Sequence, residues 1–406
     1  MAESSTCYEP SGQSFLKAYN RRKVLGIFRE RGPLSRIELA QIASLDKKTI
    51  TNITRSLLDA GEICHVRTER QAAGRPKEVL ALSDRFARCI GLDVGGSHVT
   101  GVIMDFTGRM LTSETVELDL RSPFDPTSFL SICCLIIDNM LLRCGLSMDE
   151  IHSIGVSIPG HVDSEGHATL VKSIPCLQDV NLREIFGRKY GKPVLVGDCS
   201  QLMALAEMRA GAGRDVDNFL VFDLGVGIGC GIVIGRSVYA GVGGKSGELG
   251  HSIVAPGGPK CRCGRSGCVE ALASGWALND FARKHAEENP GGILAAAMRE
   301  DPHSTIRQIV AAAGRGSEYS RGLLERAGMY IGIAVSNAIS LLNPPRIILG
   351  GRMVLDNPIL LGSLEDTIRE KTLESIYRDV QIVQSDLGGR ASAIGAGLLC
   401  LEELFR

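Results

Sequence analysis

The chain has 406 residues, 44% of them hydrophobic and 22% charged, which excludes a disordered or fibrous protein and leaves room for two or three compact domains. Its 48 glycines, set against 15 prolines and one tryptophan, favour an α/β protein with glycine-rich turns. The net charge of −1 combines a basic segment with an acidic remainder. Residues 17–85 contain 15 Lys and Arg and 8 Asp and Glu, whereas the rest of the chain contains 30 Lys and Arg and 38 Asp and Glu. A basic N-terminal part on an acidic remainder predicts a nucleic-acid-binding segment joined to a domain with a different partner.

The start of the chain and its cysteines indicate a cytoplasmic protein. Residues 1–15 contain no basic segment followed by an apolar run, so no signal peptide is expected. The 13 cysteines are odd in number and mostly stand singly in apolar runs, as expected for buried thiols in a reducing compartment. The most apolar segment, residues 220–235, is interrupted by Asp223 and five glycines, so we expect no membrane insertion.

The basic part begins with two segments of helical character. Apolar residues recur at helical spacing over residues 15–28, and Gly32 ends this pattern. Ser35 is a preferred N-cap residue, and Glu38 three residues later completes a capping box. We therefore expect a second, short helix over residues 36–42.

A third helix follows after a short connection. Asp46 can cap residues 47–60, and Gly61 can end the helix in the left-handed conformation. Two short helices joined in this way form a helix-turn-helix, whose second helix reads DNA in the major groove. Ile50 and Leu57 fall on the opposite side, which faces the core. The predicted DNA contacts are Ser35, Lys47, Lys48, Thr49, Thr51, Asn52 and Arg55, together with Arg75 of the hairpin that follows.

Two segments of alternating polarity, residues 62–67 and 78–82, predict a β-hairpin after the helices. Arg75 lies near its tip and is a residue type suited to a narrow minor groove, where negative potential is concentrated. The sequence therefore predicts a winged helix-turn-helix DNA-binding domain over residues 1–85. The alternative is a solvated, charged hairpin on a small helical domain without a DNA function.

Residues 86–406 contain two strand pairs that turn through glycines, at residues 89–105 and 221–234. In phosphate-handling folds, backbone N–H groups of such turns bind phosphate oxygens and a nearby carboxylate holds Mg²⁺. Two such hairpins at the head of two α/β halves are typical of the actin-like ATPase fold, in which nucleotide lies between two lobes. The alternative is one α/β domain with glycine bulges. The candidate nucleotide-binding residues are Asp93, Gly95, Gly96, Gly225 and Gly227.

A histidine and three cysteines form a candidate metal site. Cys261, Cys263 and Cys268 lie within eight residues, two glycines allow a tight turn between them, and His251 lies ten residues upstream of the first. This set of nitrogen and sulfur ligands suits tetrahedral Zn²⁺. Because the protein would fill all four positions, the zinc is predicted to be structural. The alternative is a group of reduced, buried thiols.

Several segments together carry a family resemblance. Residues 225–251, followed by the Cys-x-Cys-Gly-x-x-Gly-Cys-x-Glu run of residues 261–270, look like the signature of the ROK family of repressors, open reading frames and sugar kinases. The resemblance spans about the whole chain and implies a two-lobed, sugar-kinase-like body that assembles as a homodimer or tetramer. With the winged head, the chain is similar to the repressor branch, whose members control sugar uptake and catabolism genes. Further matching segments are residues 93–96, 157–160, 343–351 and 392–397.

The resemblance also implies a sugar site. In family kinases, a carboxylate within Asn-Asp-x-Asn deprotonates the sugar hydroxyl that attacks ATP. Here residues 197–200 read Gly-Asp-Cys-Ser, so Asp198 is retained while both asparagines are replaced. That departure weakens the case for a kinase, because phosphoryl transfer depends on positioning as much as on the base. The residues that the resemblance assigns to sugar are Gly160, Asp198, Glu248, His251 and Glu270.

These features lead to one main hypothesis and two alternatives. The main hypothesis is a repressor that binds a pseudo-palindromic, double-stranded DNA operator and is released by a sugar or sugar phosphate that closes the cleft between the lobes. The first alternative is an ATP- and Mg²⁺-dependent kinase for a hexose or N-acetylhexosamine, with Asp198 as catalytic base. The second is a repressor whose inducer is a phosphotransferase-system protein, which the resemblance permits.

Overall fold

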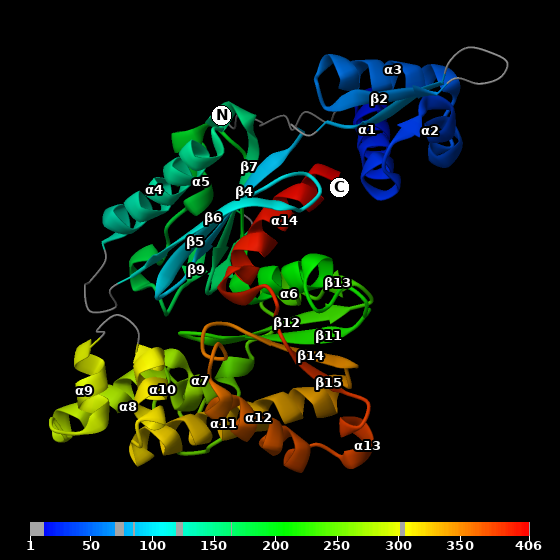
Figure 1. Cartoon of the computed structure of the whole chain (residues 1–406). Helices are drawn as coiled ribbons and strands as arrows, with labels where there is room; N and C mark the ends of the chain where they lie inside the picture. The colour runs from blue at the N-terminus through cyan, green and yellow to red at the C-terminus, as the bar shows by residue number, and fades with distance from the viewer. Residues whose placement is uncertain are drawn as a thin grey trace, which may run out of the picture.

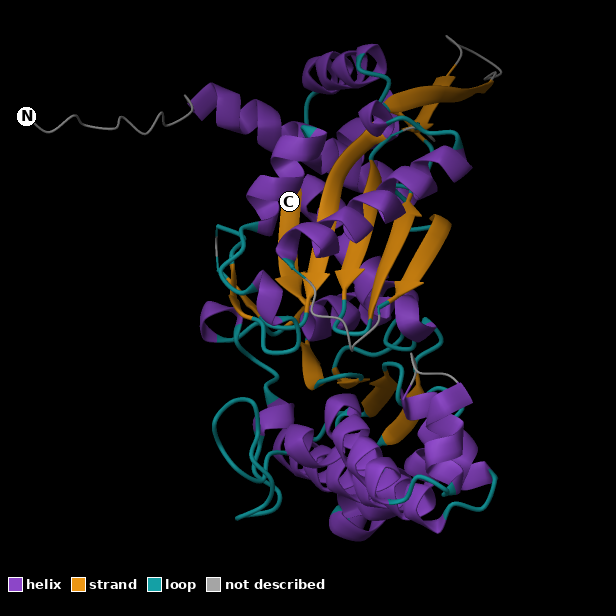
Figure 2. Cartoon of the chain, turned by 90° about the vertical axis from the view of Figure 1, so that its left-hand side faces the viewer, coloured by secondary structure: helices purple, strands orange, loops and turns teal. Residues whose placement is uncertain are grey.

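The computed structural model of the protein describes residues 12–69, 77–83, 86–118, 125–163, 165–300 and 305–405. A small N-terminal head, a first lobe and a second lobe follow one another in space, and the helices of the second lobe lie at the end farthest from the head (Figures 1 and 2). Arg75, predicted at the tip of the hairpin, lies outside the described residues.

The head contains the helices and strands that the sequence predicted. The helices are α1 (Gly12–Arg31), α2 (Arg36–Ala43) and α3 (Lys47–Asp59), and the hairpin strands are β2 (Ile63–Glu69) and β3 (Lys77–Leu82). Ser35 and Glu38 form the expected capping box, Asp46 caps α3 through the N–H groups of Lys48 and Thr49, and Gly61 has a φ of 69°. The sequence did not predict the two-residue strand β1 (Leu34–Ser35), which pairs with β3 to give the sheet order β1-β3-β2.

The core of the head is continuous with the core of the body. Ile50 and Leu57 of α3 are fully buried, and Ile53 and Leu58 pack against the same cluster. This cluster extends without a break from Val24 of α1 to residues of the body such as Leu401. The head is therefore packed against the body through a shared hydrophobic core.

The first lobe is built on a five-stranded sheet with the order β10-β7-β4-β5-β6. Its strands are β4 (Arg88–Val94), β5 (His98–Met104), β6 (Met110–Glu117), β7 (Ile151–Ile158) and β10 (Val194–Asp198). β5 runs antiparallel to both of its neighbours, β4 and β6. β7 is parallel to β4, and β10 is parallel to β7. Helices α4 (Pro126–Cys144) and α5 (Leu182–Tyr190) lie on one side of the sheet and α14 (Ala391–Phe405) on the other (Figure 1).

Among the described helices, α4 is the one whose length and apolar composition would suffice for a membrane span. Core helices of soluble proteins satisfy the same criterion. In this structure six residues of α4, including Phe129 and Met140, are buried, and the cluster that they join contains residues of the first-lobe sheet. We therefore interpret α4 as a core helix of the first lobe.

The second lobe repeats the strand arrangement of the first. Its sheet has the order β13-β12-β11-β14-β15, with a β11–β12 hairpin and a parallel β14 in the places of the β4–β5 hairpin and β7. Two sheets of equivalent topology agree with the predicted duplicated fold and exclude a single α/β domain. The strands are β11 (Phe219–Leu224), β12 (Ile228–Ile234), β13 (Ser237–Val238), β14 (Arg346–Gly350) and β15 (Gln381–Gln384).

Helices of the second lobe cover the outer face of this sheet. The longest of them, α11 (Glu318–Leu342), packs along α12 (Pro358–Lys371). The other helices of this layer are α7 (Val269–Ala273), α8 (Gly275–Glu288), α9 (Ile293–Glu300), α10 (Thr305–Gly314) and α13 (Glu374–Tyr377).

Two packed helices, α6 (Cys199–Ala210) and α14, separate the two sheets (Figure 1). Their backbones approach closely, because a Cβ atom at Gly395 would lie 1.8 Å from the carbonyl oxygen of Leu202. A larger residue at position 395 would push the helices apart. The glycine therefore lets α6 and α14 form one tight layer between the lobes.

Candidate functional site

One cleft between the lobes contains every residue that the sequence assigned to sugar or nucleotide. Its walls come from both sheets and from the first residues of α6 and α14. Residues far apart in the chain, such as Asp93 and Glu270, meet here because the two hairpins face each other across the cleft. The predicted residues that line it are Asp93, Gly95, Gly96, Gly160, Asp198, Gly225, Gly227, Glu248, His251 and Glu270.

Asp198 is both the N-cap residue of α6 and a carboxyl group that lines the cleft. It ends β10 and caps α6, accepting hydrogen bonds from the N–H groups of Ser200 at 3.0 Å and Gln201 at 3.1 Å. Burial raises the pKa of Asp198 to about 7, and the negative charges of Glu248 and Asp223 add to this shift. A carboxyl group with a pKa near 7 can accept or donate a proton at neutral pH, so Asp198 has the chemistry required of a base.

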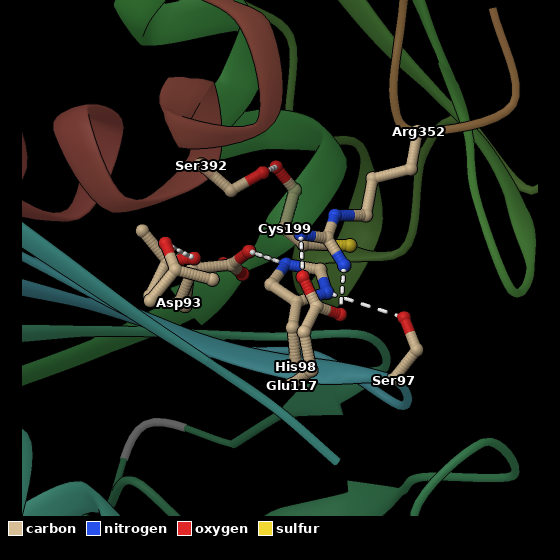
Figure 3. A network of polar contacts seen from close by, with 10 residues as sticks. Asp93, Ser97, His98, Glu117, Cys199, Arg352 and Ser392 are labelled. Atoms are coloured by element: carbon tan, nitrogen blue, oxygen red, sulfur yellow. Dashed lines mark hydrogen bonds and ion pairs between the residues drawn. The ribbon is translucent and has the colours of Figure 1, made fainter. Parts of the chain in front are cut away.

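A polar network around Asp93 also lines the cleft (Figure 3). One carboxylate oxygen of Asp93 accepts a hydrogen bond from the Ser157 hydroxyl at 2.9 Å, and the other lies 3.1 Å from His98 Nε2. Asp93 is only 7% exposed. Its predicted position beside the glycine turn is therefore observed, and both of its oxygens already have partners within the protein.

A second pair in this network joins the two lobes. Glu117, at the end of β6, forms a two-pronged ion pair with the guanidinium of Arg352, with both N–O distances 2.5 Å (Figure 3). The Arg352 guanidinium holds the pKa of Glu117 below its usual range. Arg352 follows β14 in the second lobe and lines the cleft, so this contact connects the lobes beside the glycine turns. The sequence did not indicate it, because the two residues are 235 positions apart.

Glu248 is also held by a residue that the sequence did not single out. Its Oε1 atom lies 2.8 Å from His161 Nε2 of the first lobe, and its Oε2 atom lies 3.7 Å from His251 Nε2. The only advance signal for His161 was that it follows Pro159 and Gly160 of a recognised segment.

The four predicted metal ligands converge on one point. The ligand atoms of His251, Cys261, Cys263 and Cys268 all lie within 4.8 Å of one another. His251 Nδ1 is 3.5 Å from Cys261 Sγ, and Cys263 Sγ is 3.7 Å from Cys268 Sγ. Ligand atoms about 3.5–3.8 Å apart are expected around tetrahedral zinc, given Zn–S and Zn–N bonds of about 2.3 and 2.0 Å. The chemistry and the spacing of the donors thus fit Zn²⁺.

His251 was assigned both to metal and to sugar, and its two nitrogens face different groups. Nδ1 points to the cysteine cluster and Nε2 to Glu248. A histidine that binds metal through one nitrogen commonly donates its other N–H to a carboxylate. At 3.7 Å this contact is longer than a hydrogen bond, but it places the ring of a predicted metal ligand beside a cleft carboxylate.

The predicted DNA contacts on α3 are accessible in part. Lys47, Lys48, Asn52 and Arg55 are exposed, whereas Thr49 and Thr51 are half-buried. The Thr49 hydroxyl donates to the capping Asp46, and the Thr51 hydroxyl donates to the Lys47 carbonyl. Both hydroxyl oxygens can still accept a hydrogen bond.

The placement of Ser35 differs from the prediction. Ser35 is 2% exposed and its hydroxyl donates to Glu38, 2.8 Å away, within the capping box. It has no surface with which to contact DNA. Ser35 was predicted as a DNA contact from its residue type and its place at the start of a helix, whereas its side chain is buried and is used in the capping box.

Known proteins resemble this chain over its whole length. The xylose repressor of Bacillus subtilis (strain 168) is 25% identical over 390 residues, which are 96% of this chain and 97% of the relative. The DNA-binding transcriptional dual regulator NagC of Escherichia coli (strain K12) is 28% identical over 396 residues and 95% of each chain. A solved ROK family transcriptional regulator, described as a homologue of the E. coli MLC protein, has a TM-score of 0.74 and 29% identity, and the match covers 96% of this chain and 97% of that one.

Kinases of the same family match only the body. A ROK family glucokinase from Streptomyces griseus, solved with glucose and AMPPNP, has a TM-score of 0.66 and 26% identity, and the match covers 77% of this chain and 99% of the kinase. The sequence model of the ROK family matches residues 89–403, from the first strand of the first lobe almost to the end of α14. The chain therefore belongs to the ROK family.

Proposed function

We propose that this protein is a DNA-binding transcriptional repressor of sugar genes, released from its operator by a sugar or sugar derivative bound in the cleft. Residues 1–85 would form the winged helix-turn-helix that reads DNA, and residues 86–406 the effector-binding and oligomerisation body. The observation that carries the proposal is the match of named regulators over head and body together, whereas the glucokinase matches over the body alone. A homodimer or tetramer in the cytoplasm, on a pseudo-palindromic operator, completes the proposal.

The exposed face of α3 supports DNA reading. Lys47 and Lys48 lie in its first turn, where backbone N–H groups and the helix dipole also favour phosphate. Asn52 and Arg55, one turn and two turns further, are exposed and of the types that bond to base edges. Arg36 of α2 connects α3 to the hairpin. Its Nε donates a hydrogen bond to Thr54 Oγ1 of α3 at 3.0 Å, and its Nη1 lies 2.5 Å from Glu78 Oε2 of the hairpin.

The α6–α14 layer supports coupling between cleft and head. Both helices begin in the cleft, α6 at Cys199 and α14 at Ala391. α14 then runs for 15 residues, or about 22 Å at 1.5 Å per residue, toward the head. Its last turns pack into the same buried cluster as α1. A change in the cleft can therefore move the support on which the head rests.

The contact between this layer and the head is specific. The ring of Phe405 lies edge-on to Phe86, the first residue of the body, at 6.4 Å, and the guanidinium of Arg29, in α1 of the head, stacks over the Phe405 ring at 4.8 Å. Arg209 near the end of α6 is paired with Glu402 of α14, with an N–O distance of 2.5 Å. Burial, and the charge of Arg209, lower the pKa of Arg29. The ends of both helices thus meet the head at one site, as an effector-controlled repressor requires.

The proposal is tested by selecting operator sequences from a random duplex library and measuring affinity by fluorescence anisotropy. Lys47→Ala should weaken binding to all duplexes alike, because it removes a phosphate contact, and Asn52→Ala should broaden the selected sequences, because it removes a base contact. Lys189→Ala, an exposed lysine of α5 in the body, is the matched control and should leave both unchanged. A library from which no sequence is enriched would exclude operator recognition.

A sugar kinase is the second candidate, favoured by Asp198 with its pKa of about 7 and by the solved glucokinase. Two sets of contacts weigh against it, because they already engage groups near the glycine turn: the Asp93 carboxylate is bonded to Ser157 and His98, and Arg352 is paired with Glu117. ADP release with a panel of hexoses and N-acetylhexosamines in the presence of ATP and Mg²⁺ decides the matter. Turnover that Asp198→Asn abolishes would establish kinase chemistry.

A further inference from the structure

His161 is held at the wall of the cleft by the local backbone. It begins the short strand β8 (His161–Val162), which pairs with β9 (Ala168–Leu170) in the first lobe. The preceding Gly160 has a φ of 153°, and a Cβ atom there would lie 2.0 Å from the carbonyl oxygen of Leu170. Only glycine fits this turn. It fixes the path of the chain so that the His161 side chain lines the cleft and is only 17% exposed.

The imidazole of His161 makes a direct contact across the lobes. Its Nε2 atom lies 2.8 Å from Glu248 Oε1, so Nε2 carries the proton and the carboxylate accepts it. The other oxygen of Glu248 faces His251 of the metal cluster at 3.7 Å. The hydrogen bond from His161 of the first lobe therefore orients this carboxylate, while His251 of the second lobe lies beside its other oxygen.

Glu248 keeps capacity for a ligand in this arrangement. A carboxylate has about four acceptor positions, and the two histidines can use one each. The Glu248 side chain is 44% exposed, and it lines the cleft. The unused positions are therefore open to hydroxyl groups of a bound molecule, and their direction is set by the hydrogen bond from His161.

We propose that His161 is a specificity-determining residue of the sugar site: by orienting Glu248 from the opposite lobe, it selects the configuration of the hydroxyls that the cleft accepts. The ligand class is a sugar that presents neighbouring hydroxyl donors to Glu248 and the other cleft carboxylates, Asp198 and Glu270. The inference rests on the proposed sugar-binding function. It goes beyond that function by adding a residue that the family signature does not contain.

Two substitutions separate this role from a merely structural one. Gln carries its amide nitrogen at about the position of histidine Nε2, so His161→Gln keeps the donor to Glu248, whereas the shorter Asn in His161→Asn cannot reach. His167→Gln is the matched control, because His167 lies in the same hairpin region, contacts Asp163 at 3.0 Å and does not line the cleft.

The test measures dissociation constants by calorimetry for D-glucose, D-mannose, D-galactose, D-xylose and N-acetyl-D-glucosamine. We expect His161→Asn to change the ratio of constants between the best sugar and its epimers by about tenfold, as for the loss of one charge-assisted hydrogen bond. His161→Gln and His167→Gln should keep the wild-type ratio.

Three results would overturn the inference. The first is an unchanged ratio in His161→Asn, and the second is an equal loss of affinity for all sugars, which would indicate a structural role. The third is a wild-type protein that binds none of the sugars, which would refute the proposed effector site itself and the inference with it. Thermal melting of each variant separates these results from unfolding.

Discussion

Cys263 is the residue that tests the metal cluster most simply. It is half-buried, and its Sγ atom faces that of Cys268 at 3.7 Å. We propose that this cluster holds a structural Zn²⁺, which would cross-link the loop of residues 251–268 that precedes α7. Cys263→Ser should then lower the zinc content from about one per chain and cost several kcal/mol of stability, on the order of the loss of a structural site.

The measurement is metal analysis by mass spectrometry together with thermal unfolding. Cys64→Ser is the control, because Cys64 is exposed on the hairpin of the head and outside the cluster. Full stability of metal-free wild-type protein would contradict a structural metal.

Asp198 gives a prediction for the dependence of stability on pH. Burial raises its pKa in the folded protein to about 7, whereas an unfolded chain has a value of about 3.9. The folded state therefore binds a proton that the unfolded state has lost, and stability decreases as the pH rises between these values. Asn also caps helices well, so Asp198→Asn should keep α6 intact. It should also remove the loss of stability that ionisation of the buried carboxyl group causes.

We expect Asp198→Asn to be as stable as the wild type near pH 4 and more stable above pH 7, by about 4 kcal/mol for a pKa difference of about three units. Urea unfolding across this range measures the difference. A difference that does not vary with pH would mean that Asp198 is charged in the folded protein throughout.

At the scale of elements, Phe405 at the end of α14 is a contact through which we propose that the cleft acts on the head. Phe405→Ala removes the ring that packs on Phe86 and lies under Arg29. We expect a loss of about 2 kcal/mol in stability, because the ring is only partly buried. Sugar affinity should stay within about twofold of the wild type, while the fall in operator affinity caused by sugar should become much smaller.

The matched control is Leu142→Ala on α4, since Leu142 is 80% exposed. Operator affinity with and without sugar, measured by anisotropy, provides the comparison. If Phe405→Ala releases DNA on sugar addition as the wild type does, the head is coupled to the cleft by another route.

Elements with local signals were predicted well from the sequence. Capping residues such as Ser35 and Asp46 placed the starts of α2 and α3 within a residue, and the glycine turns placed both hairpins. The strand β1 was missed because two residues carry no periodicity, and it forms only by pairing with β3. The α6–α14 layer was missed because backbone contact at Gly395 depends on residues almost 200 positions apart.

In the candidate site, too, residues with a local sequence signal were predicted, and residues that depend on distant partners were not. Residues of recognised segments, such as Asp93 and Glu270, were found in advance and do line the cleft. His161 was not found in advance, because its significance depends on Glu248, 87 positions away. Glu117 was not found either, because its partner Arg352 is 235 positions away. The burial of Ser35, a predicted DNA contact, was not foreseen because residue type and helix position alone do not reveal burial.

At the scale of the whole molecule, the two lobes and the head behave as one packed unit. The cleft has walls from both lobes, and the pairs His161–Glu248 and Glu117–Arg352 bridge them. The α6–α14 layer lies between the lobes and reaches the head. A ligand that changes the separation of the lobes must therefore disturb the layer that supports the head. Under the proposed function, the sugar-bound and the DNA-bound state would differ in this layer.

The central claim is that sugar in the cleft and operator DNA on the head oppose each other, and thermodynamic linkage gives its most direct test. The affinity of the best sugar is measured by calorimetry with and without saturating operator, and the affinity of the operator by anisotropy with and without saturating sugar. The account predicts that each ligand weakens the other by the same factor, between about 5- and 150-fold. Two affinities that are each unchanged by the other ligand would contradict it.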